Sequence, residues 1–306
     1  SMSGGSTSMK SPDHIHFDVI IPTHNSHDYI GRALDSVISQ TYPSWTVYVV
    51  DGSDDDLTSH IVMDFMQRYP LHDIRFVDQD RDHHPHLSGA RNQAIALGSS
   101  THIALLDSDD IWYPEHLEEL VGGWHESPDA AMVCTVGEYD QDYHSVKGNT
   151  SFRRRFHLDV LDERIPRGAE WLLATHYPGL IIVPSVSSFK RALFESVGGF
   201  PRVRYEEDVA LFSLLLREGG VSPGEGGESF KQVPFVGAWL DWLRGGHKVS
   251  DEMHGAGKSN LQRDRSFYSM RWHDWCQHLL SDPPAGLIGT GWEDRCRTII
   301  RGDWPW

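Results

Sequence analysis

Short apolar segments alternate with amphipathic segments along the first part of the chain. The apolar segments have the length and bulk of buried strands and comprise Phe17–Ile21, Trp45–Val50, Ile74–Val77 and Ile103–Leu106. The amphipathic segments predict helices over about His27–Ser39, Leu57–Tyr69, Ser88–Leu97 and Pro114–Trp124. Strands and helices that alternate at intervals of about thirty residues are typical of βαβ units. The pattern therefore predicts an α/β protein, with a Rossmann-like, mostly parallel central sheet and helices on both faces.

Polar and acidic residues directly follow three of these strands. The strand ends read Pro22-Thr23-His24-Asn25, Asp51-Gly52-Ser53-Asp54-Asp55-Asp56 and Asp107-Ser108-Asp109-Asp110. Right-handed crossovers bring the carboxyl ends of parallel strands to one edge of the sheet. We therefore expect His24 and the acids Asp51, Asp107 and Asp109 to share a crevice, which is where open α/β sheets bind ligands.

Asp107 and Asp109 are separated by one residue, which suits a hard divalent cation such as Mg²⁺ or Mn²⁺ that bridges to phosphate groups. The alternative for an isolated Asp-Xaa-Asp is a solvated acidic turn, and Asp54–Asp56 is interpreted in that way. His83, His84 and His86 suggest a zinc site, but a proline lies among them and no ligand-spaced cysteine or acid accompanies them. We interpret them as a loop.

The second half of the sequence is less regular. The alternation lapses between about residues 139 and 178, where Arg153-Arg154-Arg155 is either a solvated basic face or a phosphate contact. Later elements are expected at Gly179–Ser188 (strand), Lys190–Val197 (helix) and Gln232–Leu243 (strand). Between the last two, Tyr205-Glu206-Glu207-Asp208 opens an amphipathic helix. The helix dipole favours acids in the first turn, but three in succession exceed what capping needs.

Residues 1–13 are expected to be a disordered tag or tail, residues 14–248 one domain, and residues 249–306 a loop with a helical extension. The tail lacks the apolar region of a signal peptide. No apolar run approaches the about 20 residues that cross a bilayer. Cys134, Cys276 and Cys296 lack the spacing of a metal site. These features predict a reduced, cytoplasmic protein, with peripheral attachment to a membrane left open.

Seven phrases of the sequence carry a resemblance to a known family. They are IIPTHN at 20–25, VVDGSDDD at 49–56, SGARNQAI at 88–95, LLDSDDIWYPEHL at 105–117, VGGF at 197–200, YEEDVALF at 205–212 and RGGHKVS at 244–250. In this order the phrases resemble the family 2 inverting glycosyltransferases, which have the GT-A fold. The resemblance covers about residues 15–250 and implies a nucleotide-sugar donor held across the strand ends with a divalent metal, Mn²⁺ or Mg²⁺.

The resemblance also implies roles for single residues. Asp208 matches the second acid of the family's Glu-Asp motif, the usual catalytic base, and Glu207 lies beside it. Asp107 and Asp109 match the metal-binding pair, and His247 matches a histidine that completes the metal site or touches the diphosphate. The residues expected to contact the donor are Pro22, Thr23, Asn25, Asp51, Arg91, Asp107, Ser108, Trp239 and Arg244. Trp239 could equally line the acceptor site or pack in the core.

The resemblance thus implies a metal-dependent, hexosyltransferase-like enzyme that moves a sugar to an acceptor hydroxyl, with a UDP-sugar as the default donor. One alternative is a sugar-phosphate nucleotidyltransferase, although the first strand end has no glycine-rich phosphate loop. Another is a catalytically silent nucleotide-sugar- or glycan-binding module. A glycan, lipid-linked or small-molecule acceptor is expected. The net charge of -17 disfavours nucleic acid. The sequence leaves the oligomeric state undecided, and burial of the Trp-rich C-terminus against a second copy of the chain is one option.

Overall fold

The computed structural model describes residues 14–144, 151–158, 182–202, 207–219 and 230–240, and the single positions 277, 280, 294, 297, 300 and 301. Of the predicted site residues, Arg244 and His247 lie outside the described residues, as does most of the segment 249–306. The predicted domain boundaries therefore stay predictions. Within the described part of the chain, no helix combines the length and the apolar character that spanning a membrane requires.

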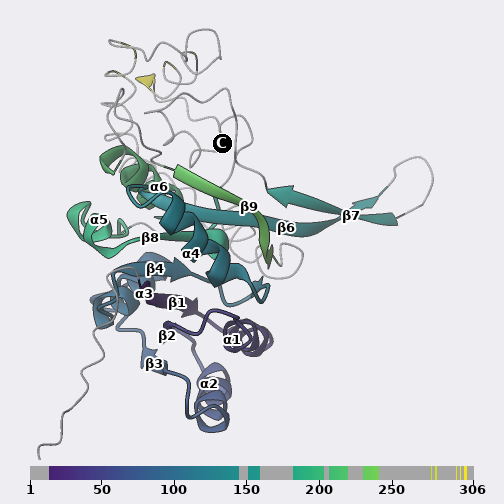
Figure 1. Cartoon of the computed structure of the whole chain (residues 1–306). Coiled ribbons are helices and arrows are strands. Elements are labelled where there is room, and N and C mark those ends of the chain that lie inside the picture. Colours follow the sequence, from purple (N-terminus) through teal and green to yellow (C-terminus); the bar gives the residue numbers. More distant parts are fainter. Residues whose placement is uncertain are drawn as a thin grey trace, which may run out of the picture.

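The first half of the described chain alternates strands and helices, as the sequence predicts. Its elements are β1 (Phe17–Thr23), α1 (Ile30–Ile38), β2 (Trp45–Asp51), α2 (Leu57–Arg68), β3 (Ile74–Asp78), α3 (His86–Leu97) and β4 (His102–Leu105). The strands pair in parallel in the order β3-β2-β1-β4. In Figure 1, α1 and α2 lie to the right of these strands and α3 to the left, so helices cover both faces of this half.

Beyond β4 the sheet is mixed. The remaining elements are β5 (Ile111–Trp112), α4 (His116–Glu126), β6 (Met132–His144), β7 (Ser151–Leu158), η3 (Pro184–Val186), β8 (Ser187–Lys190), α5 (Arg191–Ser196), α6 (Glu207–Glu218) and β9 (Phe230–Leu240). The sheet continues as β4-β8-β6-β9-β5. Strand β8 is antiparallel to β4 and β6, whereas β9 is parallel to β6. Parallel pairing thus holds throughout the first four strands, and the predicted α/β class is confirmed.

A long antiparallel arm occupies the region where the sequence shows no regular alternation. Strand β6 pairs with β7, and the two strands project from the body in Figure 1. Their register sets Asp140 opposite Arg155 and Asp142 opposite Arg153, so the basic cluster lies on a strand that faces acidic positions. Strands rich in charged residues lack the apolar alternation by which strands are recognised, which explains why the sequence did not predict the arm.

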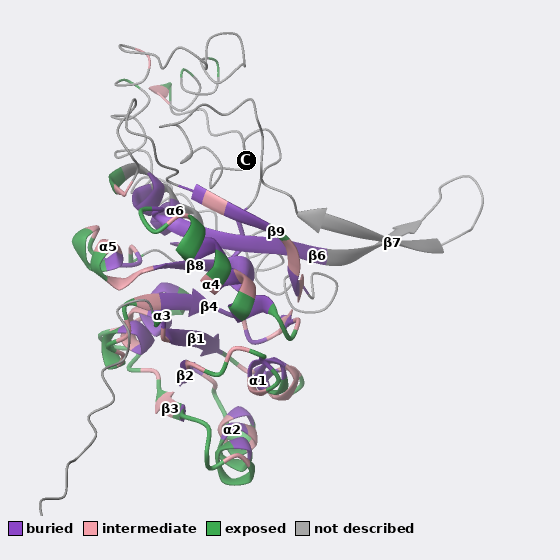
Figure 2. Cartoon of the chain, viewed as in Figure 1, coloured by how far each residue is buried: buried purple, intermediate pink, exposed green. Residues whose placement is uncertain are grey.

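Burial explains why the first strands are continuous apolar runs. All 7 residues of β1 and all 7 of β2 are buried, as is typical of parallel strands covered on both faces. Figure 2 shows buried residues concentrated in the sheet, while the outer sides of α2 and α5 are exposed. Because these strands are packed from both sides, the positions of the residues at their carboxyl ends are fixed as well.

One buried ion pair ties β1 to the second half of the chain. Asp18 in β1 is 1% exposed, and Nη2 of Arg191, at the start of α5, donates to its carboxylate at 2.6 Å. Ser100 donates to the same carboxylate from its backbone N–H at 2.9 Å and from its hydroxyl at 2.7 Å. Because these hydrogen bonds satisfy both carboxylate oxygens, the core tolerates the negative charge.

We expect Asp18→Asn to lower the free energy of unfolding by about 3–5 kcal/mol, because it removes the buried counter-ion of Arg191 and leaves only the exposed carboxylate of Glu195, 3.9 Å away. Urea unfolding of the variant and the wild type measures the difference. The matched control is Asp64→Asn, which breaks the exposed Asp64–Arg68 pair of α2 and is expected to cost about 0.2–1 kcal/mol. Equal losses in the two variants would contradict this account.

A buried histidine, His116, and a half-buried one, His102, make the stability of the fold sensitive to acid. Burial lowers the pKa of His116 from 6.5 to about 3 and is the main cause that lowers the pKa of His102 to about 4. The unfolded chain therefore binds more protons than the folded chain between these values and 6.5, so the free energy of unfolding falls as the pH falls below 6.5.

We expect His116→Gln to make this acid-induced loss shallower, by up to about 1.4 kcal/mol per pH unit. Urea unfolding at a series of pH values measures the slope. His60 provides the control, because its side chain is 67% exposed. In His60→Gln the free energy of unfolding should depend on pH with the same slope as in the wild type. The same slope in the His116 variant as in the wild type would show that this histidine does not contribute.

Candidate active site at the carboxyl ends of the strands

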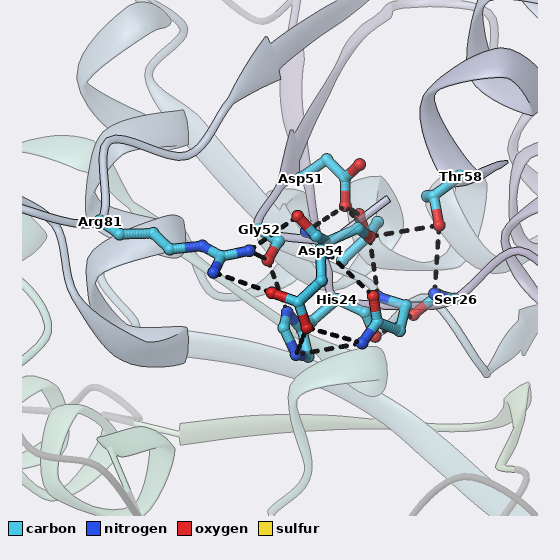
Figure 3. Close-up of polar contacts among 10 residues, drawn as sticks. His24, Ser26, Asp51, Gly52, Asp54, Thr58 and Arg81 are labelled. Carbon is cyan, nitrogen blue, oxygen red and sulfur yellow. Dashed lines mark hydrogen bonds and ion pairs between the residues drawn. The ribbon is translucent and has the colours of Figure 1, made fainter. Parts of the chain in front are cut away.

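Asp51, the last residue of β2, has one oxygen held by the protein and one left open. The parallel register sets it opposite Thr23, whose hydroxyl donates to Asp51 Oδ1 at 2.6 Å. The backbone N–H and the hydroxyl of Ser53 donate to the same oxygen at 3.1 and 2.5 Å. No hydrogen bond from the described residues reaches Oδ2 (Figure 3). Asp51 is 7% exposed, so a buried, oriented acceptor remains at this strand end.

The residues after β1 and β2 hold each other in place above Asp51. A ring nitrogen of His24, Nδ1, lies 2.6 Å from the carbonyl oxygen of Gly52. Asn25 and Asp54 pair in both directions, because Asn25 Nδ2 donates to Asp54 Oδ2 at 3.3 Å and Asp54 N–H donates to Asn25 Oδ1 at 3.0 Å. The Asn25 amide and the Arg81 guanidinium lower the pKa of Asp54. The acidic run after Asp51 is therefore partly ordered.

Arg81 is a site residue that sequence reasoning missed. It follows β3, and its guanidinium donates to the carbonyl oxygens of Gly52 and Ser53 and to Asp54 Oδ1, the last at 3.0 Å (Figure 3). A Cβ on Gly52 would lie 2.2 Å from Gln79 Oε1, so a larger residue here would displace the Gln79 side-chain amide. A single arginine in an acidic loop gave no sequence signal, since its partners are backbone carbonyls of another loop.

The acidic segment after β4 alternates between exposed and buried side chains. Asp107 and Asp109 are partly exposed, whereas Ser108 is 9% and Asp110 8% exposed. The Ser108 hydroxyl donates to Ser26 Oγ at 2.9 Å. Ser185 accepts from the Asp107 N–H at 3.0 Å and donates to Asp110 Oδ2 at 2.5 Å. The buried pair thus anchors the segment, and the predicted metal-binding pair is the pair that remains accessible.

Arg91 lies at the centre of a group of carboxylates. Its side chain is 1% exposed, Nη2 donates to Asp107 Oδ1 at 2.6 Å, and Nη1 donates to Glu207 Oε1. Burial alone would lower the pKa of Arg91, but the fields of Asp107, Glu207 and Asp208 outweigh it and raise that pKa. Burial raises the pKa of Glu207, Arg91 opposes that shift, and Asp208 adds to it. The structure thus joins the strand end of β4 to the first turn of α6.

The two accessible acids fit part of a divalent-cation site. Asp107 Oδ2 receives no hydrogen bond from the described residues, and the side chain is 29% exposed. Among the described residues, no group of three His, Cys, Asp or Glu side chains is placed to hold a metal ion. Two carboxylates with the remaining positions left to phosphate oxygens and water is the arrangement that Mg²⁺ uses at phosphate substrates.

For the other predicted site residues, the structure gives the position and the burial but does not assign a role. Pro22 and Thr23 are buried at the end of β1, and Asp208 is half-buried directly after Glu207. Trp239 is half-buried in β9, where it pairs with Ile111 of β5 and with a residue of β6. Because strand neighbours point to opposite faces, Trp239 lies on the other face from the buried residue before it. Its predicted contact with the donor stays a prediction.

The mixed α/β sheet with its helices is similar to the GT-A fold, which confirms the fold class that the sequence predicts. Residues 18–198 match the family described as "Glycosyl transferase family 2", and the chain belongs to that family.

Relatives and solved structures are consistent with this family. A 100-residue segment is 35% identical to the UDP-Glc:alpha-D-GlcNAc-diphosphoundecaprenol beta-1,3-glucosyltransferase WfgD of Escherichia coli, covering 33% of this chain and 37% of WfgD. The amylovoran biosynthesis glycosyltransferase AmsB of Erwinia amylovora is 30% identical over 105 residues, 34% of each chain. The matching segments thus span little more than a third of these relatives.

Two solved structures show the same fold. S. aureus TarS 1-349 in complex with UDP-GlcNAc superposes with a TM-score of 0.59 at 15% identity, over 94% of this chain and 71% of TarS. The mannosyltransferase PcManGT from Pyrobaculum calidifontis, in complex with GDP-Man and Mn²⁺, superposes with a TM-score of 0.52 at 17% identity, over 94% of this chain and 74% of PcManGT.

Proposed function

We propose that this chain transfers a sugar from a nucleoside-diphosphate sugar to an acceptor hydroxyl, with inversion and with a UDP-sugar as donor. The observation that carries the proposal is the meeting of three acidic positions at one edge of the sheet. They are Asp51 with an open oxygen, the accessible Asp107/Asp109 pair, and Asp208 at the start of α6. WfgD, whose name states a UDP-glucose donor and a diphosphoundecaprenol-linked acceptor, supports the donor class and makes a lipid-linked acceptor one of the options.

Asp51 is suited to reading the nucleobase. An ionised carboxylate only accepts hydrogen bonds, and Thr23 and Ser53 orient this one so that Oδ2 remains open. Uracil, thymine and guanine each present a ring N–H, whereas the corresponding ring nitrogen of cytosine carries no hydrogen. The site should therefore accept the first three bases and reject cytosine. Pro22 and Asn25 border the same pocket in this proposal.

Asp107 and Asp109 would hold the divalent cation, together with His247 if the family pattern extends to it. When bound there, the cation stabilises the negative charge that develops on the departing diphosphate. Trp239 and Arg244 belong to this proposal only through the resemblance.

Asp208 is the general base in this proposal. Arg91 binds Glu207, the first residue of α6, and Asp208, the second residue, is half-buried. A carboxylate that removes the proton from the acceptor hydroxyl as the bond to the sugar carbon forms contributes roughly 10²–10⁴-fold. A base on one side of that carbon and the diphosphate on the other suit a single in-line displacement with inversion.

We expect Asp208→Asn to lower kcat by roughly 10²–10⁴-fold while UDP binding in the presence of Mn²⁺ is retained. Release of UDP from UDP-sugars measures turnover, and calorimetry measures binding. Glu218→Gln at the other end of α6 is the control and should keep wild-type turnover. Unchanged turnover in the Asp208 variant would exclude it as the base.

We expect UDP, GDP and dTDP to raise the thermal stability of the wild type and CMP to leave it unchanged, with the largest shift for UDP with Mn²⁺. A ligand at a hundredfold excess over its dissociation constant adds about 2.7 kcal/mol of stability. Asp51→Asn should lose the UDP shift, because the amide presents its N–H groups or a neutral oxygen to the base. Asp56→Asn, in the same acidic run but exposed, should keep it. Stabilisation by CMP would contradict the proposed reading of the base.

A further inference from the structure

Arg91 and the residue after it dock the segment that leads into α6. Asn92 Oδ1 accepts from the Phe200 N–H at 2.9 Å, and Asn92 Nδ2 donates to the Phe200 carbonyl at 2.8 Å. The Arg91 guanidinium lies 5.4 Å from the centre of the Phe200 ring and also donates to Glu207. Neighbouring residues of α3 thus bind the backbone of Phe200, between α5 and α6, and form an ion pair with the first turn of α6.

The same guanidinium reaches the strand end of β4. Its Nη2 donates to Asp107 Oδ1 at 2.6 Å, while its Nη1 is engaged by Glu207. Asp107 and Glu207 lie far apart in the sequence and come from different elements, a loop after a strand and a helix start. A planar guanidinium presents donors in a rigid fork, so the two carboxylates it binds are held at a fixed separation.

Arg91 is poorly placed to bind a donor directly. Its side chain is 1% exposed, and both Nη atoms donate to carboxylates. The Nε–H group has no hydrogen-bond acceptor within the described part of the chain. It is also buried, so it is not exposed to a ligand in solution. A direct contact with a nucleotide would require breaking a buried ion pair, which is strongly unfavourable when it leaves a charge without its partner.

We propose that Arg91 is a positioning residue that fixes the separation between the cation-holding Asp107 and the base Asp208, acting through Glu207 and without contact to the donor. The inference rests on the proposed function. The donor and the acceptor hydroxyl must meet in line, so an error of about 1 Å between the two carboxylate groups is expected to cost turnover more than binding.

The first variant is Arg91→Lys, which keeps the positive charge but replaces the fork by one point charge. We expect kcat to fall at least tenfold, while the KM for the UDP-sugar and the dissociation constant of UDP with Mn²⁺ stay within twofold. The matched control is Arg191→Lys. Arg191 bridges Asp18 and two backbone carbonyls in the same buried manner but away from the strand ends. The control should lose thermal stability without losing kcat, measured at a temperature where both variants are folded.

The second variant is Glu207→Gln, which tests the other end of the ion pair. Residues that act as a unit give non-additive effects. We therefore expect the double variant Arg91→Lys/Glu207→Gln to lose no more of kcat than the worse single variant. The thermal midpoint of each variant is measured alongside, so that a loss of folded protein is separated from a loss of turnover.

Three outcomes would overturn the assignment. A tenfold weaker UDP affinity in Arg91→Lys would make Arg91 a donor-binding residue. A loss of kcat in Arg191→Lys equal to that in Arg91→Lys would reduce the role of Arg91 to general stability. Additive losses in the double variant would separate Arg91 from Glu207. A wild type that neither binds UDP nor releases it from a UDP-sugar would instead overturn the proposed function, and this inference with it.

Discussion

Carboxylates gathered at one edge of a sheet repel one another, and the buried guanidinium of Arg91 is what makes their meeting tolerable. Asp107 and Glu207 each give it an oxygen, and the field of Asp208 acts on it too. Removing the guanidinium would leave the carboxylates without a counter-ion, and removing the carboxylates would leave the buried guanidinium without one. This cation links the first turn of α6 directly to the strand end of β4, and therefore the candidate base region to the candidate cation site.

Asp51 shows a second way to keep an acid at a strand end. There the protein uses neutral donors, two hydroxyls and a backbone N–H, all directed at one oxygen. Asp107 also has one engaged and one open oxygen, since Arg91 donates to Oδ1 and no described residue donates to Oδ2. In both acids the protein fixes the orientation of the carboxylate through one oxygen, and no described residue donates a hydrogen bond to the other. Orienting groups before a ligand arrives reduces the reorganisation needed when it binds.

The sequence could predict the first half of the fold because its strands are buried on both faces and its helices are amphipathic. It also placed Asp51 and Asp107 at strand ends, since each directly follows a continuous apolar run and opens a run of polar residues. The partners of these acids could not be predicted. Arg91 meets Glu207 only through the docking of α6, and Arg81 meets backbone carbonyls, which no residue pattern encodes. The arm of β6 and β7 was missed because its sequence is too polar to show alternation.

The segment from Asp107 to Asp110 shows how local burial produces an accessible pair of acids. Exposed and buried side chains alternate in this turn. The buried ones are polar and each has a hydrogen-bond partner, Ser26 for Ser108 and Ser185 for Asp110. Ser26 lies in the loop after β1, and Ser185 lies in η3, which precedes β8. The two hydrogen bonds therefore anchor the segment on both neighbours of β4 in the sheet. An apolar residue in place of Asp110 would bury as well, but the Ser185 hydroxyl would lose the acceptor to which it donates. The buried polar residues are therefore part of the construction of the accessible acid pair.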